Sequence, residues 1–178
     1  MDLTERTLSR QEVYQGRIVG VHVDQVSLPN GKTARREIVT HPGGVAILAL
    51  DDKRRAAVVR QYRYAFSRVL TEIPAGKLEP GEADPLAAAR RELREEVGAE
   101  AGHWESLGTL LPSPGCYDEV LHLFLARELT FAAPQPDEDE FLECEWMPLE
   151  ELAQQALSGA LSDAKTVAAA LKAVCLGL

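Results

Sequence analysis

The sequence predicts a mixed fold of the α/β (α+β) class, in which helices interrupt a mostly antiparallel arrangement of strands. Short apolar stretches separated by turn residues run between residues 17 and 74. An Asp-Pro pair then opens a helix at residues 85 to 97, and two alanine- and leucine-rich segments close the sequence. Together these features favour one globular domain that contains both strands and helices.

The first strands are predicted from apolar periodicity and turn residues. Residues 17–28 and 36–40 alternate apolar and polar side chains in places, and PNGK at 29–32 between them is a strong hairpin signal. A second pair of apolar strands follows at 44–50 and 56–64, separated by the charged turn DDKRR. LTEIP at 70–74 predicts a further short strand, and the Gly- and Pro-rich AGKLEPGEAD after it predicts a loop.

The helix at 85–97 has a start signal and a stop signal. Asp84 is suited to the N-cap position, Pro85 to the first helical position and Gly98 to the C-terminal stop. Further along, strands are expected at 104–111, 120–130 and 142–148, and helices at 149–157 and 163–175. PQPDEDE at 134–140 is expected to form an acidic loop.

Bulk properties exclude several classes of function. With 178 residues and 46% hydrophobic content, the chain can bury one substantial core. A net charge of −9 argues against general nucleic-acid binding, so an anionic substrate would need a bound cation or a few placed arginines. Three widely separated cysteines without CxxC spacing, and the lack of an apolar leader or a long apolar run, predict a cytoplasmic protein that does not enter the membrane.

Three acidic residues crowd the end of the predicted helix. Glu92 lies three positions before Glu95 and four before Glu96, and each like-charge pair costs about 0.2–0.5 kcal/mol in an isolated helix. One interpretation is a solvated charged face in which Arg91 and its neighbours offset the repulsion. The other is a divalent-cation site, because oxygen-rich clusters suit Mg²⁺ or Mn²⁺, and the preceding loop adds Glu79 and Glu82.

This segment resembles the signature of the Nudix hydrolases, G-x5-E-x7-R-E-U-x-E-E-x-G-U, in which U is aliphatic. The matching positions are Gly76, Glu82, Arg91, Glu92, Leu93, Glu95, Glu96, Gly98 and Ala99. Eight residues separate Glu82 from Arg91 where the signature has seven, so the loop before the helix carries a one-residue insertion. The insertion leaves the register of the three helical glutamates unchanged.

The resemblance extends over most of the chain and is greatest to the ADP-ribose pyrophosphatase branch of the family. The similar segments are RIVGVHVDQVSLPNGKTARREIVTHPGGVAIL, VVRQYRY, EIPAGKLEPGE, LLPSPGCYDEVLHLFLA and DEDEFLECEWMPLEEL. It implies a Nudix α/β/α sandwich with a mixed sheet at residues 43–178, preceded at 1–42 by an N-terminal β-hairpin region. In this branch that region commonly forms a homodimer.

The resemblance also implies roles for individual residues. Metal ions would be held by the side chains of Glu92, Glu95 and Glu96 and by the backbone carbonyl of Ala75. Glu95 would also assist catalysis. The catalytic base would come from the acidic loop, as Glu138 or Glu140. The implied substrate-binding residues are Arg63, Arg60, Glu72, Arg36, Arg17, Ile18 and Glu119, and the implied structural supports of the site are Gly76, Glu82, Arg91 and Gly98.

The implied reaction is the Mg²⁺-dependent hydrolysis of ADP-ribose to AMP and ribose 5-phosphate, with Mn²⁺ as an alternative ion. Closely spaced divalent ions neutralise phosphoryl oxygens and make a water nucleophilic, as pyrophosphate hydrolysis requires. Two alternatives stay open. One is the same chemistry on another nucleoside diphosphate derivative, such as a sugar nucleotide, NADH or a dinucleoside polyphosphate. The other is a sensor that binds ADP-ribose without turnover.

Overall fold

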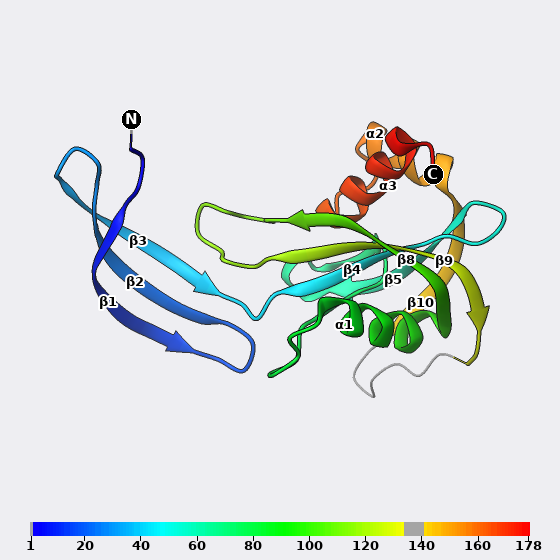
Figure 1. The fold of residues 1–178 in the computed structure, drawn as a ribbon, viewed down its shortest axis with the longest axis horizontal. Helices are drawn as coiled ribbons and strands as arrows, with labels where there is room; N and C mark the ends of the chain where they lie inside the picture. Colours follow the sequence, from blue (N-terminus) through cyan, green and yellow to red (C-terminus); the bar gives the residue numbers. More distant parts are fainter. Residues whose placement is uncertain (1, 134–140) are drawn as a thin grey trace. The chain divides into compact units, whose positions relative to one another are not determined.

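The computed structural model describes residues 2–133 and 141–178. Two compact units can be distinguished in the chain (Figure 1). The first contains Met1–Gly43 together with Leu111–Val120, and the second contains Gly44–Leu110 and Leu121–Leu178. None of the helices in the described residues combines the length and the apolar character that crossing a bilayer requires.

The first unit is built on a three-stranded antiparallel sheet in the order β1-β2-β3. Its strands are β1 (Arg6–Gln15), β2 (Gly20–Ser27) and β3 (Thr33–Thr40). The predicted hairpin is confirmed as β2 and β3, joined by a turn in which Gly31 adopts a φ of 81°. Leu28 N donates to Lys32 O at 2.7 Å across that turn. Segment 111–120 belongs to this unit because Val39 N donates to Cys116 O (2.7 Å) and Asp118 N to Val39 O (3.1 Å).

The second unit contains two sheets. The four-stranded sheet has the order β7-β4-β9-β8, from β7 (Ala75–Lys77), β4 (Gly44–Ala49), β9 (Leu121–Phe131) and β8 (Ala99–Leu110). Its central pair β4 and β9 is parallel and the other pairs are antiparallel. The three-stranded sheet is antiparallel, in the order β10-β5-β6, from β10 (Leu142–Pro148), β5 (Arg55–Arg63) and β6 (Arg68–Glu72). A 3₁₀ turn, η1 (Tyr64–Phe66), links β5 to β6.

Helices cover both faces of the four-stranded sheet, which confirms the α/β/α sandwich (Figure 1). Helix α1 (Pro85–Glu92), which continues into the π-helical segment η2 (Leu93–Val97), lies on one face, and α2 (Leu149–Ser158) and α3 (Ala164–Leu176) lie on the other. Alternate β4 side chains point to opposite faces, so Ile47 packs in the α1 core and Leu48 in the α2–α3 core. This two-sided burial explains why β4 is an uninterrupted apolar run.

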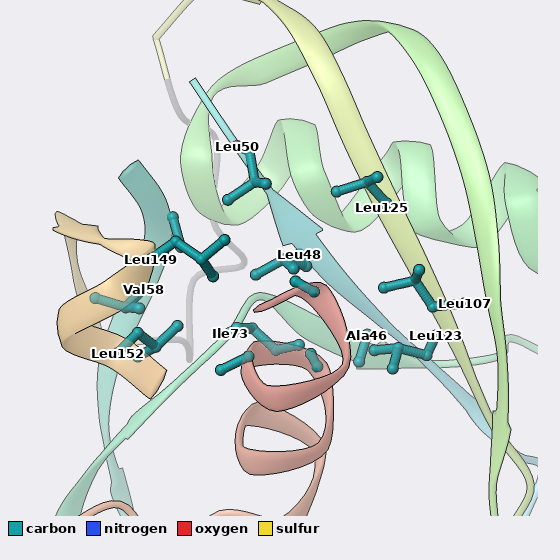
Figure 2. Close-up of a cluster of buried hydrophobic side chains, with 14 of the residues drawn as sticks. Ala46, Leu48, Leu50, Val58, Ile73, Leu107, Leu123, Leu125, Leu149 and Leu152 are labelled. Atoms are coloured by element: carbon teal, nitrogen blue, oxygen red, sulfur yellow. The ribbon is translucent and has the colours of Figure 1, made fainter. Parts of the chain in front are cut away.

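The larger core gathers aliphatic side chains from both sheets and from α2 and α3 (Figure 2). Leu48 and Leu123 from the strands and Ile73 from the link between β6 and β7 meet Leu149 and Leu152 from α2, and all five are essentially inaccessible to solvent. Burying each such side chain stabilises the fold by about 1.5–3 kcal/mol. Because Ile73 lies in this core, the chain leading to β7 is firmly anchored immediately before the candidate site.

Candidate functional site

Helix α1 starts where the sequence predicts, and its continuation η2 stops at Gly98 as predicted, but its last turn is not α-helical. Asp84 Oδ1 accepts a hydrogen bond from Leu86 N at 3.0 Å, so it is the N-cap residue, and Pro85 occupies the first turn. The last turn, η2, has π-helical hydrogen bonding and ends at Gly98, whose φ of 68° is left-handed. π-helical turns inside α-helices are frequent at functional sites.

Glu92 and Glu96 are buried, with relative exposures of 6% and 3%. The interpretation of this cluster as a solvated charged face is therefore wrong for these two residues. The core-facing side of the helix is formed mainly by Ala89, Leu93 and Val97, and the two glutamates lie next to it, against β7. A buried carboxylate is costly unless it is hydrogen-bonded, paired or bound to a metal, so both positions need strong partners.

The backbone at Ala75 and Gly76 lies directly against these carboxylates. Ala75 N donates to Glu96 Oε2 at 3.1 Å. A Cβ atom placed on Gly76 would lie 1.9 Å from Glu92 Oε1, a distance that no real side chain could keep. The glycine in the sequence signature therefore has a steric cause here, because only glycine lets the strand pass this close to the glutamate.

Arg91 connects the acidic residues of the site. Its Nη1 donates to Glu92 Oε1 at 2.7 Å and to Glu95 Oε2 at 3.0 Å, and its Nη2 donates to Glu82 Oε2 at 3.2 Å. Burial lowers the pKa of Arg91, but the charge of Glu92 and the hydrogen bonds raise it more, so the net shift is upward. Arg91 thus offsets part of the repulsion between the helical glutamates. It does so from a side chain that is only 24% exposed, and not on a solvated face.

The one-residue insertion does not separate Glu82 from the helix. Glu82 accepts from Glu79 N at 3.0 Å as well as from Arg91. The hydrogen bond from the Glu79 N–H lowers the pKa of the Glu82 carboxyl most; burial opposes this, and Arg91 lowers the pKa further, so the net shift is downward. The additional residue is therefore accommodated in the loop between Glu82 and the Asp84 cap.

Arg63 and Glu72 form a second polar cluster near the first. Arg63 Nε and Nη2 donate to the two oxygens of Glu72 at 2.7 and 2.8 Å, and Lys165 also donates to Glu72, which is 2% exposed. The charge of Glu96 contributes to the raised pKa of Arg63, after its hydrogen bond to Glu72. Residues 63, 72 and 96 therefore share one electrostatic environment. Lys165 was not predicted from the sequence, because no local pattern marks a lysine whose partner lies 93 positions away.

Arg60 is not brought to this cluster. It lies three positions before Arg63 on β5, and side chains at odd spacing point to opposite faces of a strand. Arg60 Nη1 donates instead to Glu143 Oε2 at 3.0 Å, on the neighbouring strand β10, and its Nε lies 3.7 Å from Glu145. Its interaction in the structure is a cross-strand ion pair.

The other predicted substrate-binding residues belong to the first unit. Arg36 forms a two-pronged ion pair with Glu5, at 2.9 and 2.5 Å. Arg17 and Ile18 are exposed in the turn between β1 and β2. Glu119 lies 3.4 Å from His41 Nδ1. Glu138 and Glu140, the two predicted bases, lie outside the described residues.

The donor set near η2 consists of oxygen atoms, which suit Mg²⁺ or Mn²⁺ and not a softer metal. Within residues 2–133 and 141–178, no three His, Cys, Asp or Glu side chains converge as a metal-binding group. Two buried carboxylates do lie beside one stretch of backbone: Glu96 accepts from Ala75 N, and Glu92 lies against the adjoining Gly76. These residues fit a hard divalent cation that would draw them together.

Comparison with known proteins identifies the family. The NUDIX domain model matches residues 40–170, and the model of the nucleoside diphosphate sugar hydrolase N-terminal domain matches residues 5–45. A methanol dehydrogenase activator of Bacillus methanolicus is 43% identical over 93% of this chain and 90% of its own. An ADP-ribose pyrophosphatase of Bacillus subtilis (strain 168) is 42% identical over 92% of this chain and 89% of its own.

Among solved structures, the crystal structure of an ADP compounds hydrolase superposes with a TM-score of 0.84. It covers 99% of this chain and 96% of the other, at 23% sequence identity, and so supports the fold. The family match spans more than half of the chain and includes α1, η2 and the buried glutamates. This chain belongs to the Nudix family.

Proposed function

We propose that this protein hydrolyses the pyrophosphate bond of ADP-ribose, giving AMP and ribose 5-phosphate, with Mg²⁺ as the physiological ion. The observation that supports this substrate best is the similarity to the B. subtilis ADP-ribose pyrophosphatase over nearly the whole chain. The buried Glu92 and Glu96 beside the Ala75–Gly76 backbone support the chemistry, because a pyrophosphatase must concentrate positive charge at this place.

In this proposal Glu92, Glu96, the Ala75 carbonyl and Glu95 hold the divalent cations. Bound Mg²⁺ would neutralise phosphoryl oxygens and favour ionisation of a water. Gly76 leaves space for the Glu92 carboxylate, and Arg91 orients Glu92 and Glu95 through its two Nη1 hydrogen bonds. Gly98 ends the helix directly after this set.

The remaining roles concern the substrate and the water. Arg63, whose side chain is 38% exposed, would bind a phosphate with the edge of the guanidinium that Glu72 does not occupy. Glu138 or Glu140 would accept a proton from the attacking water. The water oxygen forms a bond to phosphorus, the bridging P–O bond breaks, and the leaving phosphate oxygen takes up the charge.

A substrate panel tests the proposal. Purified protein with Mg²⁺ is incubated with ADP-ribose, NADH, GDP-mannose, diadenosine polyphosphates and 8-oxo-dGTP, and the products are separated by ion-exchange chromatography. We expect AMP and ribose 5-phosphate, formed fastest from ADP-ribose and not at all with excess chelator. Faster cleavage of another compound would overturn the substrate but retain the pyrophosphatase. Absence of cleavage together with ADP-ribose binding would favour a sensor.

NADH is the second candidate substrate. It contains an ADP group linked through the same kind of pyrophosphate, and a relative of 43% identity is named as an activator of a dehydrogenase. If NADH is the substrate, the panel should give AMP and reduced nicotinamide mononucleotide at a higher kcat/KM than that for ADP-ribose.

We further propose that the protein is a cytoplasmic homodimer formed through its N-terminal β-hairpin region, residues 1–42. Every residue of β1 is exposed in the single chain, including Leu8, Val13 and Tyr14 at 56–59%. Apolar side chains exposed in this number along one strand favour burial against another copy. The substrate-binding roles of Arg36, Arg17, Ile18 and Glu119 remain part of this proposal.

A further inference from the structure

Lys165 lies in the first turn of α3 and makes contacts that no surface lysine needs. Its Nζ donates to Glu72 Oε2 and, at 2.9 Å, to Asp163 Oδ1. The lysine side chain is 13% exposed and that of Glu72 is 2% exposed. Burying a long cationic side chain costs conformational entropy and hydration, so a buried lysine is normally paired with a carboxylate that offsets this cost.

The charge held by Lys165 is the one that also binds Arg63. Glu72 accepts from Arg63 with both carboxylate oxygens, and Lys165 shares the Oε2 atom. With Asp163, which also accepts from Lys165, the set has two cationic and two anionic side chains and is neutral. If Lys165 were absent, the two carboxylates would outweigh Arg63, and the guanidinium would be a weaker partner for a phosphate.

The same turn of α3 also fixes the strand that leads to the site. Thr166 Oγ1 accepts from Ile73 N at 2.8 Å and donates to Asp163 Oδ2 at 2.6 Å. Ile73 follows Glu72 and lies two residues before Ala75, whose N–H donates to Glu96. The start of α3 thus sets the backbone position of Glu72, and Lys165 sets the position of its carboxylate.

We propose that Lys165 is a positioning residue for substrate binding, which acts through Glu72 to keep Arg63 oriented toward the pyrophosphate of the substrate and to offset the negative charge beside it. This inference rests on the proposed function. It predicts a change in the affinity for the substrate with little change in turnover, because Lys165 donates to Glu72 and Asp163, neither of which is a proposed metal ligand.

Lys165→Met tests the inference, with Lys172→Met as the matched control. Lys172 is on the same helix and donates to Leu107 O, so its loss also removes one lysine hydrogen bond from α3 but does not affect Glu72. For Lys165→Met we expect KM for ADP-ribose to rise about tenfold and kcat to stay within about threefold of the wild-type value. Lys165→Arg should restore KM, and Lys172→Met should leave it unchanged.

The outcomes separate this inference from the proposed function. If wild-type protein prefers another substrate, the proposed substrate fails, and the same ratio of KM values is measured with the preferred compound. Calorimetric titration with inorganic pyrophosphate repeats the comparison without turnover. Equal affinities of the Lys165→Met and Lys172→Met variants would overturn the role of Lys165. So would a loss in kcat without a change in KM, since that is expected of a purely structural residue.

Discussion

A Cβ atom added to Gly76 would fall 1.9 Å from Glu92 Oε1 and 2.0 Å from the carboxyl carbon of Glu92. The alanine variant must therefore displace either β7 or the Glu92 carboxylate. We expect Gly76→Ala to lower kcat for ADP-ribose about a hundredfold, since a displacement of this size in a catalytic site has an effect of that order. Steady-state kinetics measures this loss.

A double-mutant cycle shows whether the loss of kcat in Gly76→Ala is caused by displacement of Glu92. If Gly76→Ala acts by displacing that carboxylate, then adding it to Glu92→Gln should lower kcat little further. Additive losses would show that the alanine damages the site by another route, such as a shift of the Ala75 backbone. Thermal unfolding of each variant checks that the fold is retained.

Glu72 predicts a pH dependence of stability. Burial raises the pKa of its carboxyl, but the hydrogen bonds from Arg63 and the charge of Lys165 lower it more, so the folded pKa lies below the ordinary value of 4.5. The stabilisation by this group is therefore complete above the ordinary value and is lost as pH falls through the folded pKa. The difference in unfolding free energy between wild type and Glu72→Gln should narrow as pH falls from 6 toward 3 in urea titrations. A constant difference would contradict this assignment.

Individual site residues are predictable from the sequence where a local pattern marks them. Gly76, Glu82 and Arg91 were expected to support the site: Gly76 lies against the Glu92 carboxylate, Arg91 donates to Glu92 and Glu95, and Glu82 accepts from Arg91. Burial of Glu92 and Glu96 was missed because helical periodicity assigns charged residues to the solvent side. Lys165 was missed because its partner is distant in sequence.

Two aspartates at helix starts allow a prediction at the scale of elements. Asp84 caps α1 with one hydrogen bond to Leu86 N. Asp163 caps α3 by accepting from Thr166 N and Oγ1, and it also binds Lys165. We expect Asp84→Ala to cost about 1 kcal/mol of unfolding free energy and Asp163→Ala to cost more, because its loss frees several donors. Denaturant unfolding of both variants at pH 7 checks the order, and an equal cost would contradict it.

Helices and strands were predictable where burial of one face gives the sequence a regular repeat of apolar residues, and less so elsewhere. The helix at 85–97, the strands at 120–130 and 142–148, and both C-terminal helices agree with the structure to within a few residues. Strand β1 was missed, since all ten of its residues are exposed and no alternation marks a buried face. The successive strands β4 and β5 were expected as a pair, but they belong to different sheets, because pairing depends on distant strands that a local pattern does not encode.

At the scale of the whole molecule, the exposed β1 strand predicts self-association. Leu8, Val13 and Tyr14 would lie in water in a single chain, which is unfavourable by about 25 cal/mol per Å² of apolar surface. We expect light scattering to give about twice the monomer mass of 19.5 kDa for the wild-type protein. Val13→Lys should shift the mass toward the monomer, because a buried interface would have to desolvate the new ammonium group.

Gln11→Lys is the matched control, since it adds the same charge to a polar position of the same strand. If the apolar residues of β1 form the interface, this variant should remain more dimeric than Val13→Lys at equal concentration. A monomeric wild type at micromolar concentration would exclude the homodimer. Equal dissociation of both variants would instead indicate that net charge, and not burial of Val13, governs association. Activity measured on the same samples then shows whether substrate binding requires the second copy, as the proposed roles of Arg17, Ile18 and Arg36 predict.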